Sequence, residues 1–222
     1  MLKAVLFDLD GVITDSSRYH YLAWKSLADE LGIPFDEAYN EKLKGVSRME
    51  SLEFLLRHGG LQDKFTRSEK AALAARKNDL YRSLIRRVTP KDTLPGIRGF
   101  LAELKSSSIK TAVASVSKNA PFLLDRLQLT GSFDYVADAL RVQRAKPFPD
   151  IFLDAARGTG ALPRECVGIE DAAAGIEALR RAGIRSVGVG VPDQMGGADL
   201  RLHSTADLSL KLLMRAFSFD AD

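Results

Sequence analysis

The feature that most constrains this chain is its first apolar run, which ends in a pair of carboxylates. Residues 3–8 form a short strand-like run, and the chain continues as Leu9-Asp10-Gly11. Glycine permits a sharp turn at that point. In a parallel sheet the carboxyl ends of the strands open into the ligand crevice, so Asp8 and Asp10 are expected there together. Two neighbouring acids repel each other unless a cation or a proton offsets their charge. The sequence therefore predicts a charged site at the end of the first strand.

The second half of the chain alternates short apolar runs with helical patterns. Strands are predicted at 110–115, 133–137, 166–170 and 186–189, and helices at 97–107, 120–127, 150–159 and 172–182. Strand–helix alternation of this kind is typical of a parallel sheet covered on both faces. We predict an α/β fold with a doubly wound parallel-sheet core, similar to the Rossmann arrangement.

Residues 16–88 look different, because they are rich in helical patterns and contain no convincing strand. Helices are predicted at 17–31, 51–56 and 68–85, the first capped by Ser16 or Ser17 and ended by Gly32. We predict a catalytic core of residues 1–15 and 89–222, with a helical cap domain, residues 16–88, inserted after the first strand. Two short linkers between cap and core make a plausible hinge.

The composition excludes several classes of protein. The net charge is +3, from 32 basic and 29 acidic side chains, which is too small to indicate nucleic-acid binding. No run approaches the roughly 18 apolar residues of a membrane span, and the start lacks the pattern of a signal peptide. Cys166 is the only cysteine, which fits a reducing compartment. We expect a cytoplasmic protein with no membrane or nucleic-acid partner, and a monomer, since a swinging cap needs a free face.

Four sets of polar side chains lie at the edges of predicted elements. Three are at the ends of strands, and the fourth, Lys146, precedes the helix predicted at 150–159. The sets are Asp8 and Asp10, the segment from Ser115 to Asn119, Lys146, and the pair Glu170 and Asp171. The set offers hard oxygen ligands and no His/Cys cluster, which favours Mg²⁺ over a transition metal. Acids, a lysine and a divalent ion together suit phosphoryl transfer, in which a protein mainly positions and neutralises the reacting groups.

These residues resemble the four ordered motifs of the haloacid dehalogenase superfamily. The motifs are Asp8-x-Asp10-Gly11-Val12-x-x-Asp15, a serine at 115 after an apolar strand, Lys146-Pro147, and Gly168-Ile169-Glu170-Asp171. Within that superfamily the chain is similar to the β-phosphoglucomutase branch. The more specific stretches are Lys44-Gly45-Val46-Ser47-Arg48, Arg76-Lys77-Asn78 and residues 115–124. The resemblance runs from Lys3 to about Gly190 and carries nothing beyond Val191.

The resemblance implies interconversion of β-D-glucose 1-phosphate and glucose 6-phosphate through a 1,6-bisphosphate. Asp8 would be the nucleophile that forms an aspartyl-phosphate, and Asp10 the general acid and base. Mg²⁺ would be held by the side chains of Asp8 and Asp171 and the backbone carbonyl of Asp10, with Glu170 bound directly or through water. Lys146 and Ser115 would hold the transferring phosphoryl group.

A mutase must also hold the second phosphate of its bisphosphate, away from the metal. Ser117, Lys118 and Asn119 would supply donors from the core, and Arg48 would grip the same phosphate from the cap. The other implied substrate-binding residues lie in the cap: His20 and Lys77, which would align the closed site, and Trp24, Gly45 and Val46, which would shelter the sugar. The implied partner is a small sugar phosphate.

Other readings stay open at this stage. The first is a sugar-phosphate phosphatase with the same aspartates, the second a catalytically silent sugar-phosphate-binding protein; a dehalogenase is less favoured, because it needs neither Asp10 nor a metal. Lys77 also fits a solvated helix surface, since Arg76 and Asp79 flank it. Ser117 to Asn119 could simply cap the next helix. Val116 is bulkier than the residue expected there, and its effect depends on which way it faces.

Overall fold

A parallel sheet forms the centre of the core. The computed structural model describes residues 1–190 and 197–219. Within these residues the sheet has six strands in the order β3-β2-β1-β4-β5-β6, and all neighbouring strands are parallel. The strands are β1 (Ala4–Phe7), β2 (Lys110–Val113), β3 (Tyr135–Val136), β4 (Cys166–Glu170), β5 (Arg185–Val189) and β6 (Leu200–Leu202). This arrangement confirms the predicted doubly wound α/β fold.

The strand order places a crevice beside β1. In the sheet, Leu6 of β1 pairs with Ala112 of β2 on one side and with Gly168 of β4 on the other. Strands β2 and β3 lie on one side of β1, and β4, β5 and β6 follow in order on the other side. Ligands of doubly wound sheets bind where the strand order reverses in this way, outside the carboxyl ends of the strands. The residues after β1 and β4 therefore lie at the expected place for a site.

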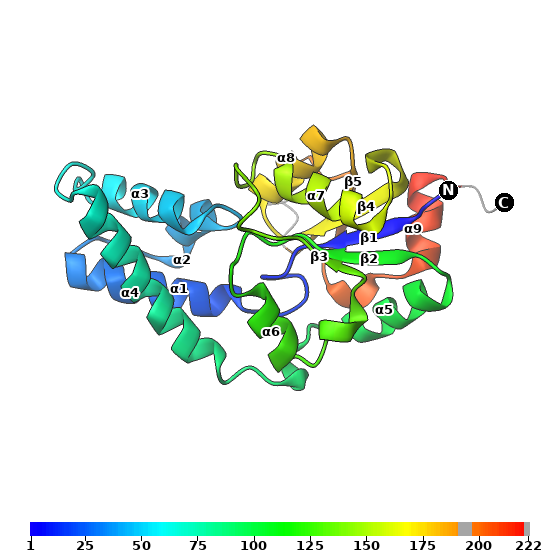
Figure 1. Cartoon of the computed structure of the whole chain (residues 1–222), viewed down its shortest axis with the longest axis horizontal. Coiled ribbons are helices and arrows are strands. Elements are labelled where there is room, and N and C mark those ends of the chain that lie inside the picture. Colours follow the sequence, from blue (N-terminus) through cyan, green and yellow to red (C-terminus); the bar gives the residue numbers. More distant parts are fainter. Residues whose placement is uncertain (191–196, 220–222) are drawn as a thin grey trace.

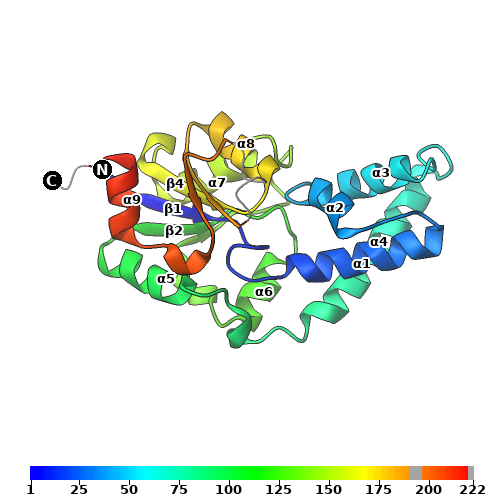
Figure 2. The same ribbon diagram turned by 180° about the vertical axis from the view of Figure 1, so that it is seen from behind.

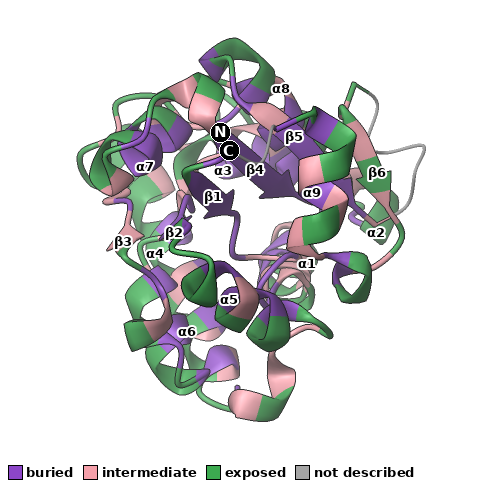
Figure 3. Ribbon diagram, turned by 90° about the vertical axis from the view of Figure 1, so that its right-hand side faces the viewer, coloured by how far each residue is buried: buried purple, intermediate pink, exposed green. Residues whose placement is uncertain are grey.

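Helices cover both faces of this sheet because alternate side chains of each strand point to opposite sides (Figure 1). Val5 and Phe7 pack with α5 (Ile97–Ser106), α6 (Ala120–Arg126) and α9 (Leu210–Phe217). Ala4 and Leu6 pack with α7 (Asp150–Thr159) and α8 (Ala173–Ala182) on the opposite face. Figure 3 shows β1 and β4 buried at the centre of these layers. The sheet is thus a rigid support for its own strand ends.

Four helices follow β1 and form a separate group at one end of the molecule, far from both termini (Figures 1 and 2). They are α1 (Ser17–Leu31), α2 (Glu37–Asn40), α3 (Arg48–His58) and α4 (Arg67–Ile85). The group has an apolar cluster of its own, which includes Trp24, Leu27, Leu52, Leu55 and Leu73. A private core of this kind supports our proposal that residues 16–88 are a cap domain, and we call them the cap.

The two linkers between cap and core are joined to each other by hydrogen bonds. The amide of Leu94 donates to the carbonyl of Ile13 at 2.9 Å, and the hydroxyl of Thr14 donates to the carbonyl of Asp92 at 2.7 Å. Asp92 ends a short 3₁₀ helix, η2 (Pro90–Asp92). The linkers therefore lie side by side, as a hinge requires.

Several helix ends differ from the sequence prediction, most of all those of α3, which spans Arg48–His58 where a helix over 51–56 was predicted. Ser16 stands at the N-cap of α1 but makes no capping bond, because its hydroxyl donates to Asp10 instead. Helix α4 begins one residue earlier than predicted, since Thr66 and Glu69 form a capping box. Gly32 ends α1 in the left-handed conformation, as predicted.

Some elements were absent from the prediction. They are β6, α2, α9 and the 3₁₀ helices η1 (Glu41–Leu43), η2, η3 (Thr130–Ser132), η4 (Pro163–Glu165) and η6 (Thr205–Asp207). Val191, where the family resemblance fades, lies outside the described residues. In the described part of the chain, no helix is both long and apolar enough to cross a membrane.

Candidate active site

Three carboxylates converge at the crevice. Asp8 follows β1, Glu170 ends β4, and Asp171 comes next; one oxygen of each lies within 4.8 Å of the others. Gly11 makes this approach possible, because a Cβ at that position would lie 2.1 Å from the Oδ2 of Asp171, and its φ is +94°. The turn after β1 therefore brings the first motif directly against the last.

Lys146 is the cation inside this cluster. Its side chain is fully buried, and its Nζ donates hydrogen bonds to Asp8 and to Glu170. Burial alone would lower the pKa of Lys146, but the two carboxylates outweigh it and raise that pKa above its ordinary value. Lys146 is therefore a permanent positive charge that links the end of β1 to the end of β4.

Glu170 and Asp171 carry more negative charge than the chain neutralises. Burial raises the pKa of Glu170, and burial with the charge of Glu170 raises the pKa of Asp171 well above its usual value. The second oxygen of Glu170 accepts from the amides of Asp171 and Ala172, at 2.8 and 2.9 Å, and so also caps the turn into α8. Three carboxylates here face one buried lysine and one lysine from the cap, so the cluster is short of positive charge.

That shortage is the reason a divalent cation fits here. Lys146 and, from the cap, Lys44 at 3.7 Å from Asp171 are the basic groups that touch the cluster among the described residues. Three oxygen ligands within 4.8 Å and no histidine or cysteine among them are the donor set of a hard cation. The site thus has the charge and the ligands for a metal ion of this class.

Asp10 occupies a different environment from Asp8. Its Oδ1 accepts hydrogen bonds from the hydroxyls of Ser16 and, at 3.5 Å, Tyr81. Burial, with the charge of Asp8, raises the pKa of Asp10 to about 6. A carboxyl group whose pKa lies near neutral pH can both accept and return a proton, whereas Asp8 is hydrogen-bonded to the Nζ of Lys146.

The cap contributes a stacked group of aromatic and basic side chains. The Nζ of Lys77 lies 2.7 Å from Nδ1 of His20 and 4.6 Å from the ring centre of Trp24. His20 stacks on Tyr81 at 3.9 Å, and its Nε2 lies 3.8 Å from Asp10. Lys77 is only 3% exposed, so the reading of it as solvated surface is wrong. Trp24 belongs to the apolar core of the cap and borders the cavity as well.

Burial also sets the charge state of this group. It lowers the pKa of Lys77 to about 7, with a further contribution from the nearby positive charge of Arg48. It lowers the pKa of His20 well below the ordinary value, again with help from Lys77. Arg48 in turn has a lowered pKa because of its own burial. Basic groups this close are destabilised unless an anion lies between them.

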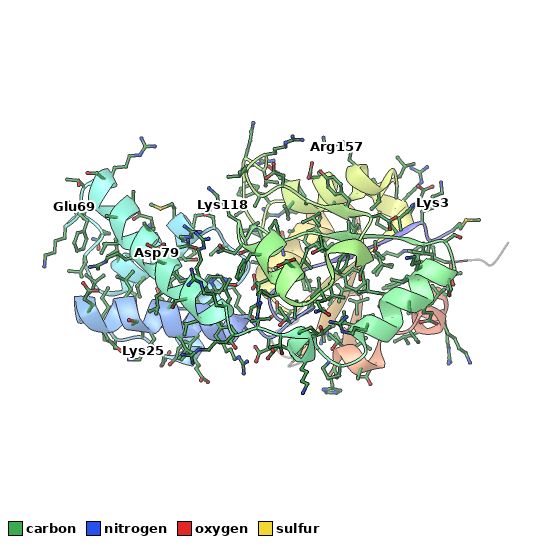
Figure 4. All side chains as sticks on the ribbon, turned by 60° about the horizontal axis from the view of Figure 1, so that its bottom comes forward. Lys3, Lys25, Glu69, Asp79, Lys118 and Arg157 are labelled. Atoms are coloured by element: carbon green, nitrogen blue, oxygen red, sulfur yellow. The ribbon has the colours of Figure 1, made fainter. Side chains whose placement is uncertain are left out.

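A cavity of about 540 Å³ lies between cap and core. Every predicted site residue borders it except Lys146, which lies behind Asp8 and Glu170. The bordering residues are Asp8, Asp10, His20, Trp24, Gly45, Val46, Arg48, Lys77, Ser115, Ser117, Lys118, Asn119, Glu170 and Asp171. Figure 4 labels Lys118 where the core meets the cap. The cavity therefore has an acidic end at the strand termini and a basic end beneath the cap.

The β2-to-α6 loop supplies the polar groups at the basic end. The amide of Ser117 donates to the hydroxyl of Ser115 at 3.1 Å, and the amide of Asn119 to the hydroxyl of Ser117 at 3.3 Å. The side chain of Asn119 makes no capping bond to α6, so the simple capping reading does not apply to it. Val116 is half-buried, packs against the core cluster of α7 and α8, and also borders the cavity.

Three residues of the site were missed from the sequence. Tyr81 lies four residues after Lys77 on α4, so helical spacing already places both on one face. Lys44 and Asn78 stand beside Gly45 and Lys77 in the stretches that carry the resemblance. The contacts of these three residues with the core could not be predicted from sequence spacing alone.

The fold and the site together define an α/β protein with an aspartate pair after its first strand, a buried lysine and a capped acidic crevice. A family model of haloacid dehalogenase-like hydrolases matches residues 2–183, and the chain belongs to this family.

Comparison with individual proteins shows a more specific similarity within this family. The chain is 50% identical over 212 residues to a β-phosphoglucomutase of Bacillus subtilis, covering 96% of this chain and 94% of that relative. The solved structure of a β-phosphoglucomutase from Clostridium difficile superposes with a TM-score of 0.95 at 44% identity, over 98% of both chains. A phosphorylated carbohydrates phosphatase of Thermotoga maritima is more distant, at 29% over 188 residues and 84% of each chain.

Proposed function

We propose that this protein is an isomerase that interconverts β-D-glucose 1-phosphate and glucose 6-phosphate. Identity of 50% with a β-phosphoglucomutase, over nearly the whole of both chains, supports this activity. The feature of the site that supports it is one cavity bordered by Asp8 at one end and by Arg48 and Asn119 at the other, which we propose to take one phosphate at each end.

The acidic end is proposed to carry the covalent step. Asp8 bears the phosphoryl group as an aspartyl-phosphate, and a hydroxyl of the sugar attacks the phosphorus. The bond from phosphorus to Asp8 breaks, a bond to the sugar oxygen forms, and the hydroxyl proton passes to Asp10. After the bisphosphate turns round, Asp8 attacks its other phosphate and Asp10 returns the proton to the departing sugar oxygen. A pKa of about 6 suits Asp10 to both directions.

Mg²⁺ is the proposed cofactor. Asp8 and Asp171 would hold it by their side chains and Asp10 by its carbonyl, with Glu170 bound directly or through water, and the ion would neutralise the oxygens of the transferring group. Lys146 lies against both Asp8 and Glu170, so it orients the nucleophile and offsets its charge. Ser115, buried at the end of β2, is proposed to add a hydroxyl donor.

The basic end is proposed to hold the second phosphate. Arg48 and Lys77 approach from the cap, and Ser117, Lys118 and Asn119 from the core, so an anion there joins the two parts. An anion there would offset the positive charge of Arg48, which helps to lower the pKa of Lys77. Trp24, His20, Gly45 and Val46 would enclose the sugar and exclude water, which otherwise hydrolyses an aspartyl-phosphate.

The test is to assay glucose 6-phosphate formation and phosphate release side by side. β-D-Glucose 1-phosphate is the substrate, with Mg²⁺, and a hexose 1,6-bisphosphate is added or omitted as primer. The proposal expects isomerisation that depends on the primer and little phosphate release. Phosphate release without isomerisation would instead establish the phosphatase alternative, to which the more distant phosphatase relative gives some support.

A further inference from the structure

A hydrogen bond between two asparagines crosses from the cap to the core. Asn119, in the loop before α6, donates its Nδ2–H to the Oδ1 of Asn78 on α4, at 3.1 Å. The two residues are 41 positions apart, and both are partly buried. Unlike the contacts of Lys44, His20 and Tyr81 with the acids, this contact lies at the basic end of the cavity.

The contact fixes the direction of a group that borders the cavity. A side-chain amide is planar and carries two N–H donors, so holding one of them determines where the other points. The amide of Asn119 is not held by its own helix, since it makes no capping bond to α6. Asn78 itself does not border the cavity, although Asn119 and Lys77 do. Asn78 is therefore placed to act through Asn119 and not on a ligand directly.

From this geometry we propose that Asn78 is a positioning residue for the second phosphate of the substrate. It holds the amide of Asn119 so that the remaining N–H faces the anion, and it does so from the cap, only when cap and core are close. The inference rests on the proposed function, because it assumes a phosphate at the basic end. A neutral amide suits the task better than a carboxylate, which would accept the same bond but repel the phosphate.

The test compares binding in four proteins: wild type, Asn78→Ala, Asn119→Ala and the double variant. The probe is glucose 1,6-bisphosphate, and its dissociation constant is measured by titration calorimetry with Mg²⁺ present. We expect Asn78→Ala to weaken binding about 5- to 10-fold, as for loss of one ordinary hydrogen bond, and the double variant to be no weaker than Asn119→Ala. Losses that multiply in the double variant, or a change below twofold in Asn78→Ala, would overturn the proposal.

Asn78→Asp gives a second readout that a purely structural role would not produce. It keeps the acceptor for Asn119 but adds a negative charge near the phosphate. Its loss of affinity relative to wild type should exceed that of Asn78→Ala, because the added carboxylate repels the phosphate from a partly buried position, where salt screens little. A loss no larger than that of Asn78→Ala would contradict the proposal. Arg76→Ala is the matched control, since Arg76 lies on the same helix and pairs with Glu30 at the surface.

These outcomes separate the inference from the proposed function. If the wild type binds the bisphosphate but does not isomerise the sugar phosphate, the proposed function fails, and the coupling of Asn78 and Asn119 is still decided by binding. If the wild type does not bind the bisphosphate at all, there is no second phosphate site and both proposals fall.

Discussion

Burial moves two key side chains of opposite charge toward neutrality. Asp10 has its pKa raised to about 6 and Lys77 has its pKa lowered to about 7, each chiefly because the charged form loses water. These values also depend on charges far away in sequence, such as that of Lys77 acting on Asp10. The sequence around Lys77, with charged neighbours on both sides, indicated solvent exposure instead. The sequence could predict that Asp10 and Lys77 belong to the site, but it could not predict their protonation states.

The lowered pKa of Lys77 predicts how stability varies with pH. The folded protein releases the Lys77 proton near pH 7, whereas the unfolded chain keeps it up to its ordinary pKa of 10.5. Between these values the unfolded state binds more protons, so the free energy of unfolding should rise with pH, by at most about 1.4 kcal/mol per unit. Lys77→Met should remove that rise. Urea unfolding of both proteins at pH 7, 8 and 9, without ligand, gives the comparison.

Lys70→Met is the control for this measurement. Lys70 lies on the same helix but pairs with Glu53 near the surface, at 2.9 Å. Its replacement removes a lysine from the same helix but leaves the buried Lys77 in place. If the difference in stability between wild type and Lys77→Met stayed constant from pH 7 to 9, Lys77 would not be the titrating group.

Asp8→Asn tests the nucleophile. The amide keeps the shape of the side chain, and Lys146 keeps its bond to Glu170, so the protein should fold with an unchanged circular dichroism spectrum. Because an amide cannot carry the phosphoryl group, both isomerisation and ester hydrolysis should fall by about 10³-fold or more. Activity within tenfold of wild type would mean that the covalent step lies elsewhere.

Helix α8 packs so closely on the site that its one glycine, Gly175, lies against Glu170. A Cβ at Gly175 would lie 1.8 Å from Oε1 of Glu170, so Gly175→Ala must displace that carboxylate. We expect Mg²⁺ affinity, measured by calorimetry, to fall about 10-fold or more, in the range found when supporting groups of metal ligands are disturbed. Unchanged affinity would show that Glu170 does not contribute to the metal site.

Gly99→Ala is a matched control for the same substitution. Gly99 lies inside α5, and a Cβ there meets no atom within 4 Å. Alanine should therefore stabilise the protein by about 0.5–1 kcal/mol through helix propensity alone and leave Mg²⁺ affinity unaltered. Thermal or urea unfolding measures the gain, and destabilisation would contradict the open environment of this position.

Element prediction succeeded where apolar runs were long enough to show a period. Strand β4 and helices α1 and α7 have the predicted bounds, because each is a clear buried or amphipathic segment. Strand β6 has three residues with Arg201 at its centre, and α2 has four, so neither shows a recognisable period. Helix α9 has such a period, but it lies beyond the point where the resemblance gave guidance. The capping role predicted for Ser16 was wrong because its partner, Asp10, is set by tertiary structure.

At the scale of the whole molecule, the cap and core each supply one half of the site. The core could be predicted from strand ends alone, since parallel strands bring their carboxyl ends to one edge. The placement of the cap over that edge could not, because it depends on paired linkers such as Thr14 with Asp92 and on contacts such as Asn78 with Asn119. We propose that this two-part site takes a ligand with a phosphate at each end.

The most direct test of the two-ended site is the ratio of two activities in Arg48→Ala, with Arg57→Ala at the far, exposed end of the same helix as control. The account predicts that Arg48→Ala lowers kcat/KM for β-D-glucose 1-phosphate isomerisation about 100-fold, while hydrolysis of p-nitrophenyl phosphate, which has one phosphate, changes by about threefold or less. Arg57→Ala should change neither. Equal losses of both activities in Arg48→Ala would contradict a second phosphate site.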